Sequence, residues 1–187
     1  MVLITMTTKL ESAELFAKDR HRSQKYETKP YYTHLEAVVD TLKHIGVNDE
    51  DSLCAAWLHD TLEDTGTTFD DIEQRFGSNV AVMVLSLSKD PKLAKKERER
   101  QYIEQLKNAP SQALLIKLCD ISSNLKELKN TSWSKTRKTK YVKKKLYNLN
   151  VIKSGLVKNK IDFPRIHGIV DGVNKVLLSY GQKPIIL

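Results

Sequence analysis

The segment around residues 53–64 constrains the fold more than any other part of the sequence. Residues 53–58 are apolar on every side of a helix, which predicts a helix at the centre of the molecule. A cluster of a histidine and three acids follows at once in residues 59–64. Buried charges persist only when they are paired or bound to a metal ion. The sequence therefore predicts a central helix that ends in a metal site or in a network of ion pairs.

Helix signals dominate the rest of the chain. Apolar residues recur at steps of three or four, and no segment shows the sustained alternation of a strand. Gly46 and Gly77 suit the ends of helices, and Thr68 with Asp71 forms a variant capping box. We expect helices over residues 10–21, 33–46, 49–64, 68–76, 78–85, 111–128, 134–157 and 164–180. The sequence predicts an all-α helical bundle in which residues 1–187 form a single domain.

The composition of the chain indicates its cellular location and the kinds of partner it can bind. The chain carries a net charge of +8, so polyanions are plausible partners, although a solvated cationic face explains the charge equally simply. The N-terminal apolar run reaches Thr8 and Lys9 too early for a signal peptide, and no run approaches membrane-spanning length. Cys54 and Cys119 fall inside apolar helical patterns and are predicted to be buried thiols in a reducing compartment. We expect a cytoplasmic protein without membrane contact.

A candidate metal site follows from the polar residues of the predicted helices. His59 and Asp60 end the central helix, and His34 and Asp120 lie where a polar side chain would otherwise be buried without a partner. Imidazole and carboxylate ligands suit Mn²⁺, Fe²⁺ or Zn²⁺. For His34 alone an ordinary surface or hydrogen-bonded histidine is the simpler reading, whereas for His59 with Asp60 a metal is favoured.

An ordered set of motifs extends from about residue 12 to residue 156. It comprises His21, Ser23 and Gln24, Pro30 and Tyr31, His34, residues 55–61, residues 63–65, Phe76 and Gly77, residues 117–120 and Asn124. This set resembles the hydrolase domain of RelA/SpoT proteins and, more narrowly, the stand-alone small alarmone hydrolases. The resemblance implies an HD-type helical bundle without a synthetase domain.

The resemblance also implies a chemistry. A family member of this kind uses Mn²⁺ to remove the 3′-pyrophosphate of guanosine tetra- or pentaphosphate, which leaves GDP or GTP. By motif position the metal ligands are His34, His59, Asp60 and Asp120. The paired acids Glu63 and Asp64 are implied to orient or deprotonate the attacking water, and Asn124 to lie on the nucleoside side.

Basic residues must accompany such an anionic substrate. The nearest candidates by sequence are Arg22, Lys25 and Lys29 in the loop before Tyr31, and Tyr31 is itself expected to contact the substrate. An exposed basic loop without a binding role is equally compatible with the three basic residues. Several positions depart from the family pattern: Lys25 or Tyr26 stands where an arginine is usual, and Leu35, Ile121 and Ser123 also differ. Lysine and arginine are not equivalent at a bidentate phosphate contact, so these changes leave the preference for guanine open.

The function therefore has alternatives. The same metal site could act on an adenosine alarmone or on the 2′-phosphate of NADPH, or the chain could be a basic module that binds nucleotide or nucleic acid without catalysis. The lysine-rich segment 135–160 contains Tyr141, Leu146 and Leu149 at helical spacing, which favours an apolar inner face with lysines outside over a nucleic-acid site. We expect a small-molecule nucleotide as the partner. The native metal and the oligomeric state stay open.

Overall fold

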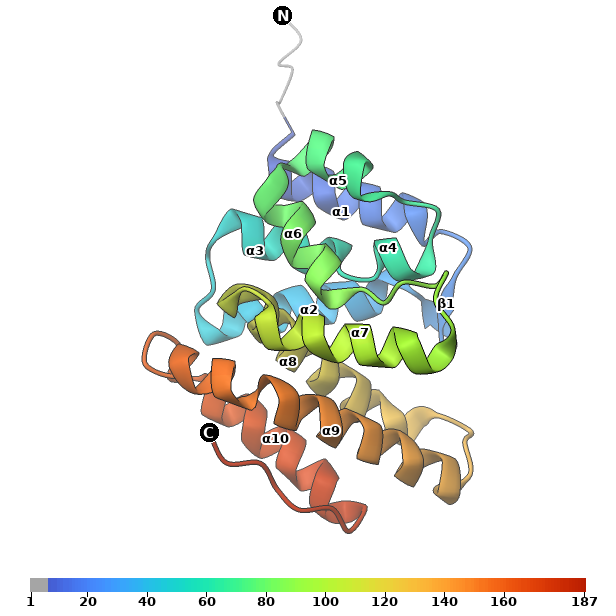
Figure 1. Cartoon of the computed structure of the whole chain (residues 1–187), viewed down its shortest axis with the longest axis vertical. Coiled ribbons are helices and arrows are strands. Elements are labelled where there is room, and N and C mark those ends of the chain that lie inside the picture. The colour runs from blue at the N-terminus through green and yellow to red at the C-terminus, as the bar shows by residue number, and fades with distance from the viewer. Residues whose placement is uncertain (1–6) are drawn as a thin grey trace, which may run out of the picture.

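Helices make up most of the computed structural model, which describes residues 7–187 (Figure 1). In chain order they are α1 (Lys9–Arg20), α2 (Tyr32–Ile45), α3 (Glu50–Leu58), α4 (Thr61–Asp64), α5 (Phe69–Phe76), α6 (Ser78–Leu87), α7 (Lys95–Asn108), α8 (Ser111–Glu127), the 3₁₀ turn η1 (Leu128–Asn130), α9 (Lys135–Asn159) and α10 (Ile166–Ser179). The predicted all-α class is confirmed. The expectation that the N-terminal run is no signal peptide falls largely on residues 1–6, which lie outside the described part.

One small hairpin departs from the helical pattern. Strands β1 (Lys25–Tyr26) and β2 (Lys29–Pro30) pair antiparallel between α1 and α2, and Glu27 at the turn has a φ of 55°. Two-residue strands are too short to show alternation in the sequence, so no pattern could predict them. The hairpin matters because it brings Tyr26 over the helices that carry the candidate site.

Most predicted helix ends are confirmed because their signals are local. Gly46 ends α2 with a φ of 101°, a left-handed conformation that suits glycine. The Asp49 side chain accepts a hydrogen bond from the Ser52 backbone and so begins α3, and Thr68 with Asp71 forms the predicted capping box of α5. Each cap supplies a partner for a helix-end backbone group that would otherwise have none.

The predicted continuous helix over residues 49–64 is wrong in one place. The chain leaves α3 at Leu58 and enters the short α4 at Thr61. At this break the His59 Nδ1 atom lies 2.7 Å from the Ala56 carbonyl oxygen, and the Thr61 hydroxyl donates to the Leu58 carbonyl oxygen at 2.7 Å. Side-chain hydrogen bonds of this kind compete with the backbone ladder of a helix. The break therefore falls at His59 and Asp60, two of the predicted metal ligands.

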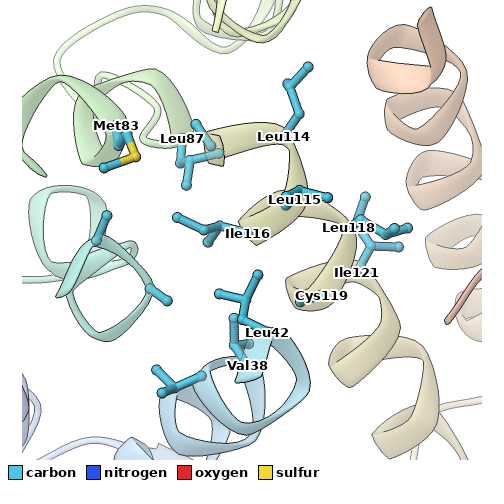
Figure 2. Close-up of a cluster of buried hydrophobic side chains, with 14 of the residues drawn as sticks. Val38, Leu42, Met83, Leu87, Leu114, Leu115, Ile116, Leu118, Cys119 and Ile121 are labelled. Atoms are coloured by element: carbon cyan, nitrogen blue, oxygen red, sulfur yellow. The ribbon is translucent and has the colours of Figure 1, made fainter. Parts of the chain in front are cut away.

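Helix α8 forms the centre of the core. It packs against α2, α3 and α6 on one side and against α9 and α10 on another. In Figure 2 Ile116 and Cys119 of α8 face the side of Val38 and Leu42 on α2, whereas Leu118 and Ile121 point toward the C-terminal helices. Cys119 and Cys54 are both buried and free, as predicted. Because other helices surround the middle of α8, a polar residue there, such as Asp120, is buried.

No helix in the described residues combines the length and the apolarity that crossing a membrane requires. The most charged long helices, α7 and α9, instead expose most of their lysines and acids. Residues Tyr102 and Leu106 anchor α7 to the core, so this strongly charged segment is an amphipathic helix.

Candidate metal centre and substrate site

Three helices bring a set of buried ligand atoms together. His34 lies in the first turn of α2, His59 directly follows α3, and Asp120 lies in the middle of α8. One ligand atom from each of these residues lies within 4.8 Å of the other two. The three residues are almost fully buried, with 2%, 2% and 4% of their surface exposed. We call these three residues the ligand cluster; their spacing and chemistry fit one divalent metal ion.

Hydrogen bonds fix the ring orientations of both histidines. A carbonyl oxygen can only accept, so His59 Nδ1 donates to Ala56, and the ring turns its Nε2 atom toward the cluster. His34 Nδ1 lies 3.1 Å from the Ser123 hydroxyl, and its Nε2 atom lies 3.4 Å from Asp120 Oδ1. Within the described residues the buried His59 Nε2 has no hydrogen-bond partner. An orphaned imidazole nitrogen whose other nitrogen is held by the backbone is the arrangement of a metal ligand.

Asp60 lies at the edge of the cluster. Its Oδ2 atom is 3.2 Å from His59 Nε2 and 3.9 Å from His34 Nε2, and it accepts a hydrogen bond from the Tyr31 hydroxyl at 2.7 Å. Its side chain is 24% exposed, more than the ligands behind it. The structure thus gathers the four predicted ligands, with three tightly grouped and Asp60 on the open side.

The charges of the site shift its pKa values in opposite directions. Burial opposes the charge on His59, but Asp60 and Asp120 raise the pKa of this imidazole to about 9. Burial likewise opposes ionisation of Asp120, but Lys117, Lys145 and the histidines hold its pKa well below the usual range. The carboxylates of the site therefore favour positive charge beside them, which a bound divalent cation would supply.

Glu63 and Asp64, the predicted catalytic acids, differ in their surroundings. Burial, together with the charges of Asp60 and Glu63, raises the pKa of Asp64 to about 6. The Tyr31 hydroxyl lies 3.3 Å from Asp64 Oδ2 and so joins Asp64 to Asp60. Glu63 instead accepts a hydrogen bond from the Lys89 backbone at 3.0 Å, and the Lys89 ammonium lies 3.6 Å away. Asp64 has the surroundings expected of a general base, and Glu63 is tied to the loop after α6.

Asn124 is held by four polar contacts. Its amide nitrogen donates to the Asp120 carbonyl oxygen at 3.0 Å and also to Asp120 Oδ1. Its amide oxygen accepts from the Tyr26 hydroxyl at 3.2 Å and from the Tyr141 hydroxyl at 3.0 Å. Both polar atoms of this side chain are occupied within the protein. Beside it lies a cavity of about 90 Å³ whose lining includes Tyr26, Trp133 and Tyr141.

The three predicted basic contacts of the first loop all lie at the surface. Arg22 is 79% exposed in its side chain and pairs with Asp19 at 3.1 Å, and Lys25 and Lys29 are exposed on the hairpin. Among residues 7–187, no hydrogen bond or ion pair joins any of the three to a predicted metal ligand. The structure therefore does not bring them into the ligand cluster.

Two other lysines reach the cluster, and the sequence reasoning missed both. Lys117 Nζ lies 2.8 Å from Asp120 Oδ2, and Lys145 Nζ lies 3.9 Å from the same oxygen. Burial lowers the pKa of Lys145 to about 8, although Asp120 partly opposes this. The expectation that the lysines of α9 lie only on its outer face is wrong for Lys145, whose side chain is 13% exposed. A usable signal existed, because Lys145 follows Tyr141 by four residues and so shares its helix face.

An all-helical fold that gathers histidine and aspartate side chains from α2, the end of α3 and α8 is the arrangement of an HD domain. A family model described as HD domain matches residues 13–149 of this chain. A solved structure whose title describes a metazoan orthologue of SpoT that hydrolyses ppGpp superposes with a TM-score of 0.76 and 28% identity, covering 93% of this chain and 96% of the other.

Sequence comparison narrows the class further. The MESH1 guanosine-3′,5′-bis(diphosphate) 3′-pyrophosphohydrolase of Danio rerio is 41% identical over 133 residues, which cover 67% of this chain and 74% of the relative. The Mus musculus protein of the same name is 41% identical over 139 residues, covering 71% and 77%. The chain therefore belongs to the HD-domain family of guanosine-3′,5′-bis(diphosphate) 3′-pyrophosphohydrolases, in its MESH1 group.

Proposed function

We propose that this chain hydrolyses guanosine tetraphosphate or pentaphosphate, releasing pyrophosphate from the 3′ position to leave GDP or GTP. Membership of the family supports the substrate class. The observation that carries the chemistry is the ligand cluster, in which the buried His59 Nε2 makes no hydrogen bond within the described residues and has the Asp60 carboxylate 3.2 Å away. A hydrogen-bonded histidine of the core would have its second nitrogen satisfied.

The proposed cofactor is Mn²⁺, held by His34, His59 and Asp120 with Asp60 as the fourth ligand. These nitrogen and oxygen donors fit Mn²⁺ and also other divalent transition metals. When bound, such an ion lowers the pKa of water and neutralises charge on a phosphoryl oxygen. The Asn124 amide, which bonds to Asp120, then acts by holding a ligand in position rather than by contacting the nucleoside.

The residues around the cluster have separate roles in this proposal. Asp64 accepts a proton from the attacking water as the new bond to phosphorus forms and the bond to the 3′ oxygen breaks. Its raised pKa, about 6, makes it a stronger base than an ordinary aspartate while leaving it ionised at neutral pH. Tyr31 positions both Asp60 and Asp64 through its hydroxyl. The exposed Lys25 and Lys29 attract the polyanion toward the site.

The nucleoside has a candidate position next to Asn124. The cavity there offers the rings of Tyr26, Trp133 and Tyr141, and aromatic faces bind bases by stacking. Stacking tolerates every base, so this surface supports a nucleotide without selecting guanine. A cytoplasmic location is part of the same proposal and is supported by the free thiols of Cys54 and Cys119.

The test is a comparison of substrates with purified chain and Mn²⁺. We expect release of pyrophosphate from guanosine tetraphosphate, faster than release of phosphate from NADPH; the adenosine analogue, run beside them, measures any preference for the base. An Asp120→Ala variant, run beside it, should lose turnover and keep its helical circular dichroism. Turnover of NADPH alone would replace the proposed substrate, and full turnover by the Asp120→Ala variant would contradict the metal site itself.

A further inference from the structure

Three lysines lie near the ligand cluster, and two of them form an ion pair with a separate acidic side chain. Lys89 pairs with Glu63 at 3.6 Å, and Lys117 pairs with Asp120 at 2.8 Å. Lys145 comes from α9, a helix that packs along α8 (Figure 1). Its ammonium lies 3.9 Å from Asp120 Oδ2, an oxygen that already accepts the hydrogen bond of Lys117.

The donors of Lys145 are not used by the protein. In the described part of the chain no hydrogen bond involves its Nζ atom, which lies 5.2 Å from the centre of the Tyr141 ring. The side chain is only 13% exposed. A cation this deep loses most of its hydration, and a buried polar group without partners costs free energy. The Tyr141 hydroxyl on the same face of α9 bonds to Asn124, so this face of the helix is directed at the site.

We propose that Lys145 binds the pyrophosphoryl group of the substrate from the α9 side of the ligand cluster. The inference rests on the proposed function and deepens it, since it assigns the anion contact to a lysine of α9 instead of the exposed loop around Lys25. A phosphate oxygen supplies the acceptors that the Lys145 ammonium lacks. It also supplies a negative charge for Lys145, because the nearby acids Glu63 and Asp120 are already paired with Lys89 and Lys117.

The experiment measures binding of inorganic pyrophosphate to the Mn²⁺-loaded chain by calorimetry. We expect Lys145→Met to weaken this affinity by about tenfold or more, the effect of losing a charge-assisted hydrogen bond, and Lys145→Arg to retain most of it. Lys144→Met is the matched control, because Lys144 is 50% exposed and pairs with Glu99 on the surface. Its affinity for pyrophosphate should equal that of the wild type.

Two further measurements separate this role from a structural one. The affinity for Mn²⁺ and the thermal midpoint of Lys145→Met should stay close to wild type, and KM for guanosine tetraphosphate should rise more than kcat falls. Equal pyrophosphate affinity in the wild type and in Lys145→Met would overturn the inference, as would a parallel loss of Mn²⁺ binding. If pyrophosphate binding depends on Lys145 but guanosine tetraphosphate is not hydrolysed, the proposed function fails and the anion contact stands.

Discussion

Replacing Lys117 by methionine should destabilise the metal-free protein by about 3 kcal/mol. The Lys117 and Asp120 side chains are only 11% and 6% exposed, and their charged atoms lie 2.8 Å apart. Burial opposes the charge on Lys117, but Asp120 raises its pKa well above the usual value, so the ion pair persists across the neutral range. Methionine preserves much of the apolar stem. The variant therefore loses the charge and leaves a buried carboxylate with weaker compensation.

The magnitude follows from the neighbours that remain. Removing one partner of a buried pair costs about 3 to 5 kcal/mol. Asp120 keeps His34 at 3.4 Å and Lys145 at 3.9 Å, so the lower end of that range applies. For a chain of this size about 3 kcal/mol corresponds to a fall in Tm of about 6 to 12 °C.

The assay is thermal unfolding followed by circular dichroism with a chelator present. Lys144→Met is the control, because its ion pair with Glu99 is at the surface and exposed pairs contribute about 0 to 1 kcal/mol. Addition of Mn²⁺ should recover part of the loss in Lys117→Met, since the ion compensates the Asp120 charge. A Tm for Lys117→Met equal to that of the control would refute the reasoning that this ion pair is buried and structural.

Three other predictions follow from the same structure. The pKa of Asp64 is about 6 in the folded state against an ordinary 3.8, so kcat/KM should fall below about pH 6. In metal-free protein the ionised carboxylate is destabilising, so the Asp64→Asn variant should be inactive yet more stable than wild type at about pH 7. This difference in stability should disappear below about pH 4 when unfolding is measured as a function of pH. Gly155→Ala would place a Cβ 2.1 Å from Leu114 Cδ1 and should lower stability by about 1 kcal/mol in thermal melts, whereas Gly172→Ala on α10, with no atom within 4 Å of the new Cβ, should raise it by about 0.5 kcal/mol. Chelation should abolish turnover and lower Tm, and Mn²⁺ should restore both; unchanged turnover after verified metal removal would argue against the cofactor.

The sequence could predict those parts of the fold that depend on neighbouring residues. The glycine at position 46 and the Thr68 cap act within one helical turn, so their outcome is decided locally. The break between α3 and α4 depends on where the His59 and Thr61 side chains find backbone partners. A periodic pattern averages over such contacts, and for that reason the helix was expected to continue.

The candidate site shows the same limit at longer range. His34, His59 and Asp120 could be proposed because a polar residue in an apolar helix needs a partner wherever the chain folds. Distance along the sequence predicts anion contacts in the loop before Tyr31, but the Arg22 side chain of this loop is largely exposed. Lys145 is far from the ligands in the chain, and only the packing of α9 on α8 places its ammonium near Asp120.

A titration of metal-free protein with Mn²⁺, followed by calorimetry, tests the central claim most directly. We predict one ion bound per chain in the wild type and binding weaker by about 100-fold in Asp120→Asn, with the helical circular dichroism of both proteins alike. Wild-type protein that binds no Mn²⁺, or an Asp120→Asn variant that binds it with unchanged affinity, would contradict a metal centre built from His34, His59 and Asp120.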